Sequence, residues 1–366
     1  MLSNRKPIDL RTDTATLPTP EMYQAMAAAP LGDDGWRDDP TVLELEQTTA
    51  TLLGKEAALF LPSGTMADLV ALMCAGRRHG GELIAHDGAW VLGGASHGGY
   101  ATIAGLAARP IPGPRGAMDL EMLEEAIDPI GHHRAPFTAI VAIENTHTAE
   151  NGAVLSIEHM SAVKAMAERK GVTLFLDGAR LPHAAVALGT TLADVASYGD
   201  LVTLSLCKAL GAPAGSMLAG SAEMIERALL YRKLLGGAMR QSGLLAACAL
   251  VALRTSLSTI ETYHTRAARL AEGLGRIDPQ FADPDLTVTN LLTLDVRHTG
   301  LDAAQWVKAL AGEDVLVAPM GRFKLRLLTH SEVLDEDIDE AIARFAIVRS
   351  RCPSTATEQL AGFGVA

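Results

Sequence analysis

The 366-residue sequence has few aromatic residues, few cysteines and no excess of positive charge. Aromatic residues make up 4% of the chain, so Ala, Leu, Val and Met carry most of its 48% apolar content, which suits helices packed on a buried sheet. A formal charge of −12 argues against a nucleic-acid partner, because phosphate binding needs a basic face. The four cysteines, Cys74, Cys207, Cys248 and Cys352, show no CxxC spacing. That absence argues against a disulfide framework or a zinc site and favours a reducing compartment.

Other absences concern membranes, nucleotides and metals. The basic N-terminal residues are not followed by an apolar stretch, so no signal peptide is expected. The apolar run 244–253 is too short to span a bilayer and predicts a buried helix. We therefore expect a cytoplasmic protein that does not associate with membranes. No G-x-G-x-x-G turn follows the early strands, which weakens the alternative of a nicotinamide dehydrogenase, and no metal site is evident.

Short apolar runs alternate with longer helical stretches in the first two thirds of the chain. The runs 57–61, 82–85, 138–143, 172–176 and 201–206 fit strands covered on both faces. Residues 65–75 and 157–170 have helical spacing, and the second of these helices is expected to end at Gly171. This alternation predicts an α/β fold with a mostly parallel central sheet and flanking helices.

The pattern changes after Gly237. Residues 239–274 predict one long connecting helix, and the segments 286–296, 301 onward, 323–328 and 334 onward predict a small C-terminal α+β domain. We therefore predict an N-terminal arm (1–30), a large cofactor-binding domain (31–250), a small C-terminal domain (251–350) and a peripheral tail (351–366).

An acid ends one of the predicted buried strands. In the segment Leu174-Phe-Leu-Asp-Gly-Ala-Arg180, an apolar strand ends at Asp177 and is followed by two small residues. Ligands of open α/β sheets sit at the carboxyl ends of the strands, so Asp177 would reach such a crevice. A carboxylate there can hold a pyridine nitrogen protonated and make the ring an electron sink. The alternative is an acid that only caps the next helix.

A lysine ends the next predicted strand. Lys208 follows the run 201–206 and precedes a turn containing Gly211. A desolvated lysine has a lowered pKa and becomes a nucleophile for carbonyl groups. An isolated strand-end lysine more often reaches out to solvent. An acid and a lysine one βαβ unit apart, however, supply the two anchors that pyridoxal 5'-phosphate (PLP) needs.

A third segment provides a seat for phosphate. Ser63, Gly64 and Thr65 form a turn that opens a helix, where backbone N–H groups and the helix dipole favour an anion. Many turns between a strand and a helix look like this, so the segment carries weight only beside the other two.

With these segments, the chain resembles the low-specificity threonine aldolase family of the fold-type I PLP enzymes, from Ile8 to about His330. The resemblance rests on separated motifs in a shared order. They are Asp9-Leu-Arg-Thr-Asp-Thr14, Gly32-Asp-Asp with Asp39-Pro-Thr41, Gly54-Lys-Glu-Ala57 leading into Leu61-Pro-Ser-Gly-Thr65, Glu144-Asn-Thr-His147, Asp177-Gly-Ala-Arg180, Lys208 with Gly211 and Gly215-Ser216, Tyr231-Arg-Lys233 with Gly236-Gly237, Met239-Arg-Gln-Ser-Gly243 and Arg326-Leu-Leu-Thr-His330.

The resemblance implies a role for each matched residue. Lys208 would form the Schiff base, Asp177 would pair with the pyridine nitrogen, and Ser63, Gly64 and Thr65 would hold the phosphate. The other implied roles are substrate carboxylate binding by Arg180 and Arg326 with Thr14, a position near the substrate hydroxyl for His147, and phosphate contacts for Lys233 and Arg240. In this family the last two often come from a neighbouring subunit, so a homodimer or homotetramer with shared active sites is expected.

Two positions depart from the family pattern. Trp90 stands where the family usually has a histidine stacked on the cofactor ring. Indole can stack but cannot shuttle a proton; His86 and His97 lie nearby in sequence and could compensate for this. Trp36, between Gly35 and Arg37, stands where a tyrosine-containing stretch is usual. Both changes concern the part of the site that would receive the substrate's side chain.

We therefore predict a PLP-dependent lyase that cleaves L-threonine or a related β-hydroxy-α-amino acid to glycine and an aldehyde, with His147 as the base. Two alternatives stay open on the same scaffold. One is a β-eliminating lyase, which would need a leaving group on Cβ, and the other is a catalytically impaired PLP-binding homologue.

Overall fold

The computed structural model describes residues 6–75, 80–93, 97–133 and 136–352. Contacts divide the chain into two units, of which the large one is Thr16–Ile260. The small unit joins the described residues of Met1–Ala15 to those of Glu261–Ala366. The first residues belong there because β1 (Ile8–Asp9) pairs with β10 (Val315–Leu316). The sequence analysis instead assigned them to an arm ending at residue 30, and most of its predicted tail, 353–366, lies outside the described residues.

The large unit is built on a seven-stranded sheet in the order β2-β8-β7-β6-β5-β3-β4. Neighbouring strands are parallel except at β8, which runs antiparallel to both β2 and β7. The mostly parallel central sheet is thus confirmed. The strands are β2 (Ala57–Leu61), β3 (Glu82–His86), β4 (Ala107–Ile111), β5 (Thr138–Glu144), β6 (Thr173–Asp177), β7 (Leu201–Ser205) and β8 (Ser216–Gly220).

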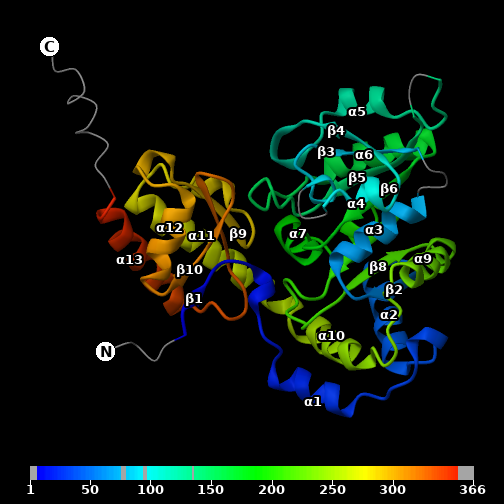
Figure 1. Cartoon of the computed structure of the whole chain (residues 1–366), viewed down its shortest axis with the longest axis horizontal. Helices are drawn as coiled ribbons and strands as arrows, with labels where there is room; N and C mark the ends of the chain where they lie inside the picture. The colour runs from blue at the N-terminus through cyan, green and yellow to red at the C-terminus, as the bar shows by residue number, and fades with distance from the viewer. Residues whose placement is uncertain (1–5, 76–79, 94–96, 134–135, 353–366) are drawn as a thin grey trace. The chain divides into compact units, whose positions relative to one another are not determined.

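Helices cover both faces of this sheet, because alternate residues of each strand point to opposite sides. In β6, Leu174 and Leu176 join one apolar cluster and Phe175 joins another. Helices α3 and α9 pack in the cluster that contains Phe175, whereas α1, α2, α5–α8 and α10 pack in the other. Figure 1 shows α1 and α2 beside α10. The helices are α1 (Pro20–Ala28), α2 (Pro40–Leu53), α3 (Gly64–Ala75), α4 (Gly99–Thr102), α5 (Leu120–Ala126), α6 (Ile157–Lys170), α7 (Leu181–Leu188), α8 (Leu192–Ala196), α9 (Ala222–Leu234) and α10 (Gly243–Thr255).

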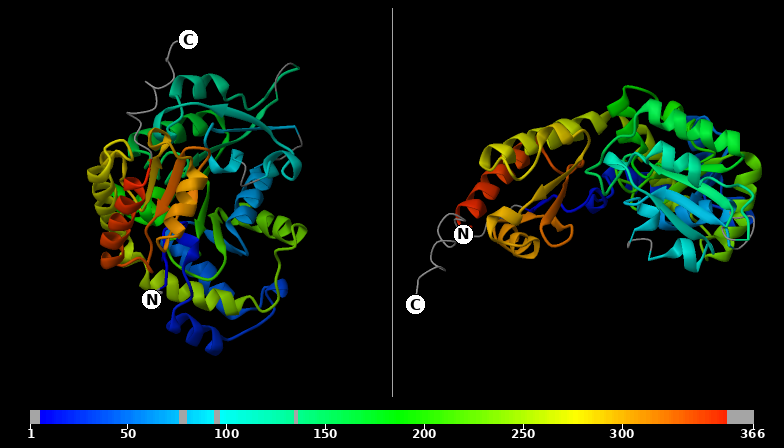
Figure 2. Two further views of the ribbon diagram at one scale, coloured as in Figure 1. Left: turned by 60° about the vertical axis from the view of Figure 1, so that its left-hand side comes forward. Right: turned by 90° about the horizontal axis from the view of Figure 1, so that it is seen from above.

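The small unit is an α+β structure, as predicted. Its antiparallel sheet has the order β11-β12-β9, and three helices share its core (Figure 2). Trp306 of α12 is fully buried there. The elements are α11 (Ile260–Ile277), β9 (Leu291–Asp295), α12 (Ala303–Ala311), β11 (Ala318–Pro319), β12 (Lys324–Leu328) and α13 (Asp335–Ser350).

The long connecting helix predicted over 239–274 is wrong. Helix α10 ends at Thr255, and a short 3-10 turn, Leu257–Thr259, separates it from α11. Ser256 follows α10, and its hydroxyl donates to the backbone oxygen of Leu210 at 2.8 Å. This long-range bond ties the end of α10 to the loop after β7. Within the described ranges no single helix is long and apolar enough to cross a membrane. Helix α10 and the stretch Leu257–Ile277, with a bend between them, meet the length and composition criteria only when taken together.

Candidate active site

Two buried acids end neighbouring parallel strands of the large sheet. Glu144 is the last residue of β5 and Asp177 the last of β6, and the two are paired in the strand register. Both are nearly inaccessible to solvent. Parallel strands present their carboxyl ends at one edge of a sheet, so both carboxylates lie where α/β folds bind ligands.

Two opposing influences act on the charge of Asp177. Burial and a neighbouring acid disfavour the carboxylate, whereas nearby cations and a backbone N–H favour it. Burial, followed by the negative charge of Glu144, raises the pKa of Asp177 from 3.8 to about 6. Lys208, the backbone N–H of Ala179 (3.0 Å to Oδ1) and Arg180 act in the opposite direction. A cation placed against Asp177 would therefore be bound strongly, because it would relieve an unfavourable buried charge.

Lys208 lies in the same cluster. It follows β7, its charge lowers the pKa of Asp177, and its Nζ lies 5.6 Å from the centroid of the Trp90 ring. An ammonium this close to an indole face is attracted to the ring's π electrons. The structure thus brings together the predicted lysine, the predicted acid and the aromatic residue predicted to stack on the cofactor.

Glu144 fixes the surroundings of this cluster. Its Oε2 accepts from the backbone N–H of Trp90 at 2.7 Å, and its Oε1 accepts from the backbone N–H of Thr148 at 2.8 Å. The carboxylate therefore anchors both the turn that carries Trp90 and the loop after β5. The sequence analysis quoted Glu144 within a motif but gave it no role.

His147 is fully buried beside these acids. Its ring makes an edge contact with His86 at 4.6 Å between centroids, and neither ring nitrogen forms a hydrogen bond with the described residues. Burial, followed by the electrostatic effect of the adjacent His86, lowers the pKa of His147 to about 4, so the ring is neutral at pH 7. A Cβ on Gly116 would lie 2.5 Å from the ring, so this glycine makes room for it. Although Nε2 lies 3.9 Å from Glu144 Oε2, neither nitrogen is hydrogen-bonded to a described residue, so both are available to a ligand.

Arg180 lies at the start of α7, immediately after the Asp177 turn. It is buried, its Nη1 donates to Thr148 Oγ1 at 3.1 Å, and its charge lowers the pKa of Asp177. A buried guanidinium presents several donors in a fixed plane, which suits a carboxylate ligand.

The predicted phosphate seat is the turn that opens α3. The Ser63 side chain accepts from the backbone N–H of Met66 at 3.2 Å, and no described atom lies within 4 Å of the place a Cβ would take on Gly64. Ser63 and Thr65 are exposed. The turn therefore keeps open space at the positive end of a helix, where an anion is favoured.

The two basic residues predicted to reach the phosphate are exposed. Lys233 lies in the last turn of α9, and the turn after this helix abuts α3, since a Cβ on Gly237 would lie 2.3 Å from Met66 Sδ. Arg240 forms an ion pair with Asp33 at 3.3 Å. Within this chain the structure gives Arg240 a carboxylate partner.

Two predicted substrate ligands belong to the small unit. Thr14 lies in a 3-10 turn, Asp13–Ala15, and its hydroxyl lies 3.0 Å from that of Thr12. Arg326 lies in β12 and donates to the backbone oxygen of Arg11 at 3.4 Å. Both residues are therefore held by contacts within the small unit.

The two histidines near Trp90 in sequence, and Trp36, differ in how far they are buried. His86 is buried, its Nδ1 accepts from the backbone N–H of Gly88, and its Nε2 lies 2.9 Å from the oxygen of Gly113. Both nitrogens are thus occupied, so His86 is poorly placed to shuttle protons. His97 is exposed, and the side chain of Trp36 is 77% exposed.

Sequence reasoning missed Asp68 and Thr203. Asp68 is the one charged residue of the apolar helix α3 and is buried, and Thr203 Oγ1 of β7 lies between its carboxyl (3.4 Å) and that of Asp177 (3.5 Å). A lone acid in a helix buried against a sheet was the available signal, because such a residue needs a polar partner.

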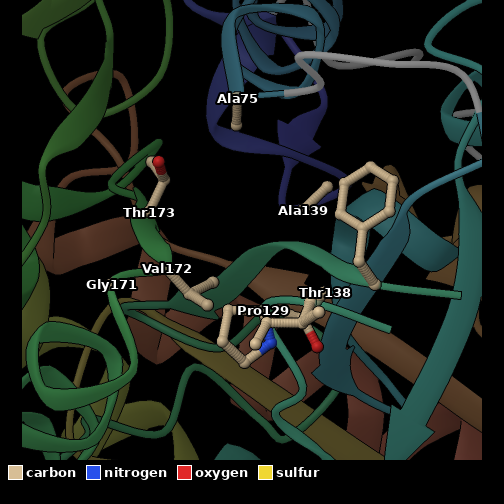
Figure 3. Close-up of a pocket in the computed structure, with 9 residues that line it drawn as sticks. Ala75, Pro129, Thr138, Ala139, Gly171, Val172 and Thr173 are labelled. Atoms are coloured by element: carbon tan, nitrogen blue, oxygen red, sulfur yellow. The ribbon is translucent and has the colours of Figure 1, made fainter. Parts of the chain in front are cut away.

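A cavity of about 320 Å³ in the large unit lies at the other edge of the sheet (Figure 3). It is lined by Thr138 and Thr173, which begin the strands that end at Glu144 and Asp177. The cavity is therefore separate from the acid cluster. Among the described residues, no group of three or more His, Cys, Asp or Glu side chains is arranged to hold a metal ion.

The chain is similar in sequence and in fold to known proteins. The family model described as beta-eliminating lyase matches residues 9–297. The low specificity L-threonine aldolase of Escherichia coli is 37% identical over 353 residues, which cover 94% of this chain and 100% of that protein. The structure of the Leishmania major threonine aldolase matches with a TM-score of 0.79 at 22% identity, over 93% of this chain and 100% of the other. A structure described as SPT with PLP matches with a TM-score of 0.73 at 16% identity, over 94% of this chain and 88% of the other.

Proposed function

Because the chain belongs to the beta-eliminating lyase family, we propose that it is a PLP-dependent carbon–carbon lyase, which cleaves L-threonine or a related β-hydroxy-α-amino acid to glycine and an aldehyde. The single observation that carries the proposal is the placement of Lys208 and buried Asp177 after neighbouring strands, within electrostatic reach of each other. The identity to the E. coli aldolase over nearly the whole chain supports the choice of substrate class.

The residues present fit PLP. Asp177 is a buried acid in need of a cation, the Gly64 turn has open space at a helix N-terminus, and Trp90 offers an aromatic face near Lys208. When bound, the cofactor would supply an aldehyde that reacts with amines and a protonated ring that withdraws electrons from Cα.

Each residue then has a defined task. Lys208 would hold the cofactor through its amine, and Asp177 would keep the cofactor's ring nitrogen protonated. Ser63, Gly64 and Thr65 would bind the phosphate, and Trp90 would pack on the ring. Because a buried anion at Asp177 costs free energy, a protonated ring nitrogen beside it is stabilised in turn.

The substrate is oriented by its carboxylate. Arg180 would bind it in a fixed plane. The same task for Arg326 and Thr14 stays a prediction from the resemblance. A fixed carboxylate would set which bond to Cα is presented to the cofactor, and the proposed activity requires that bond to be Cα–Cβ. His147, neutral at pH 7, removes the proton of the β-hydroxyl, directly or through a water.

We also propose that the chain forms a homodimer or homotetramer with shared active sites in the cytoplasm, in which Lys233 and Arg240 reach a neighbouring subunit's phosphate. Their exposure, together with that of Trp36, supports this assembly. Light scattering of the purified protein would give a mass of two or four chains, and a monomer would contradict the proposal.

A product assay tests the activity. Purified protein with PLP is given L-threonine, L-allo-threonine and phenylserine, and glycine and aldehyde are quantified. Glycine and aldehyde in equal amounts are expected, and Lys208→Ala should abolish them. Pyruvate or another keto acid with ammonia would indicate β-elimination instead, and no product from any β-hydroxy amino acid would leave only a PLP-binding role.

A further inference from the structure

A buried chain of three side chains connects helix α3 to the end of β6. Asp68 of α3, Thr203 of β7 and Asp177 of β6 are all buried, and Thr203 Oγ1 lies 3.4 Å from Asp68 Oδ1 and 3.5 Å from Asp177 Oδ1. Both distances are at the long end of the hydrogen-bonding range, so a small movement decides which carboxyl the hydroxyl engages. Within the described residues, Thr203 is the hydrogen-bonding partner of the Asp68 carboxyl.

The hydrogen-bonding capacity of the Thr203 hydroxyl limits how many protons these three side chains can share. A threonine hydroxyl has one hydrogen to donate and two lone pairs to accept with. One lone pair of Thr203 already accepts from the backbone N–H of Gly178 at 3.3 Å. If both acids were ionised, only one could receive the hydroxyl hydrogen, and the other would face a lone pair. A proton on one of the acids satisfies all three groups.

The neighbours of the two acids decide where that proton resides. The Asp177 carboxylate also accepts from the Ala179 N–H and is near the charge of Arg180, and both favour its anion. Among the described residues no backbone N–H donates to Asp68. Burial, followed by the charge of Asp177, raises its pKa well above 3.8, although its hydrogen bond with Thr203 acts in the opposite direction. The other charges acting on Asp68 are those of Lys208, which lowers its pKa, and Glu144, which raises it.

From this arrangement we propose that Asp68 is a positioning residue that carries the proton, donating to Thr203 so that the Thr203 hydroxyl donates to Asp177 and keeps it an anion facing the cofactor's ring nitrogen. The proposal rests on the proposed function, because it assigns Asp177 the partner named there. It adds a requirement that neither the resemblance nor the family assignment contains, namely a neutral acid in the first turns of α3.

The proton is located first, by a readout that needs no activity. Infrared difference spectra at pH 7 compare wild type with Asp68→Asn and with Asp177→Asn, each prepared with and without PLP. The carbonyl stretch of a neutral carboxyl group should be present in wild type, lost in Asp68→Asn and retained in Asp177→Asn. Loss of the band in Asp177→Asn alone, or no such band in wild type, overturns the proposal.

The chain of donors is tested second, through PLP affinity measured by titration. Asp68→Leu and Thr203→Val each break the chain and should weaken PLP binding by about tenfold, the effect of losing one hydrogen bond to a charged group. Asp68→Asn and Thr203→Ser each retain a donor and should recover most of that affinity. Equal losses of PLP affinity in Asp68→Asn and Asp68→Leu would overturn the proposal. If Asp68→Leu fails to fold, equal losses in Thr203→Ser and Thr203→Val would overturn it in the same way.

A matched control is Glu82→Gln. Glu82 is also a buried acid, but it begins β3 at the opposite edge of the sheet and pairs with Arg109 at 2.6 Å. It should leave the infrared band and the PLP affinity as in wild type. A wild type that binds no PLP would refute the proposed function, and Asp68's task toward the cofactor with it, while the infrared arm would still decide whether Asp68 holds the proton.

Discussion

Replacing Asp177 with asparagine should make the protein more stable while it impairs the cofactor site. Asparagine has nearly the same shape, and its Oδ1 can still accept from the Ala179 N–H, which now lies 3.0 Å from the carboxylate. The substitution therefore removes mainly the titrating charge. Near neutral pH that charge is buried beside Glu144, so its removal should raise the free energy of unfolding of protein prepared without PLP.

The expected size follows from the pKa. Burial and Glu144 raise the pKa of Asp177 from 3.8 to about 6, so the folded protein holds this proton more tightly than the unfolded chain does. The resulting stability is full below pH 3.8 and is lost as the pH rises through 6. A pKa difference of about 2 corresponds to about 3 kcal/mol, so Asp177→Asn should gain up to about that much at pH 8 and almost nothing near pH 4.

Urea unfolding at several pH values, followed by tryptophan fluorescence, measures this gain. Asp128→Asn is a control of opposite sign, because the backbone N–H groups of Gly131 and Ile130 lower the pKa of its partly exposed carboxyl. That substitution should lose stability, not gain it, as the pH rises. A stability of Asp177→Asn that is equal to or below that of wild type at pH 8 would refute the reasoning, because Asp177 would then carry its charge without cost.

Three other substitutions have definite expectations. Trp90→Ala removes the ring near Lys208 and should weaken PLP binding by about tenfold in an absorbance titration, with Trp90→Phe in between; unchanged affinity would show that the ring does not contact the cofactor. Gly116→Ala places a methyl group 2.5 Å from the His147 ring at a φ of +83°, so urea unfolding should show a loss of about 1–3 kcal/mol. Arg232→Leu removes the cation that lies 2.8 Å from the buried carboxylate of Asp34. It should lower the free energy of unfolding by about 3 kcal/mol in the same assay, and a loss below about 1 kcal/mol would contradict the geometry.

The positions of the main chemical groups could be predicted because they follow directly from strand ends. Apolar runs with turns after them gave β2 with its observed bounds and gave β5–β7 to within a residue or two, so Asp177 and Lys208 fell at carboxyl ends as expected. The antiparallel β8 was not foreseen, since three of the five residues of Ser216–Gly220 are small. Strand direction depends on pairing between distant segments, which the local pattern does not encode.

Contacts between side chains were the part that the sequence could not supply. Nothing in a linear pattern places Asp68 within reach of Thr203, because the two are 135 positions apart and meet only when α3 packs on the sheet. The same holds for Glu144, whose contacts with Trp90 cross 54 positions. Lys233 and Arg240 were assigned from the resemblance, because the local sequence pattern does not mark them as phosphate ligands.

The central claim is that Lys208 and Asp177 hold the two ends of one PLP molecule. The most direct test is the visible absorption spectrum of the purified protein with PLP, compared with those of Lys208→Ala and Asp177→Asn. The claim predicts a yellow wild type, loss of the lysine-linked band in Lys208→Ala, and weaker binding with a shifted band in Asp177→Asn. A Lys208→Ala variant that retains the wild-type band would contradict it.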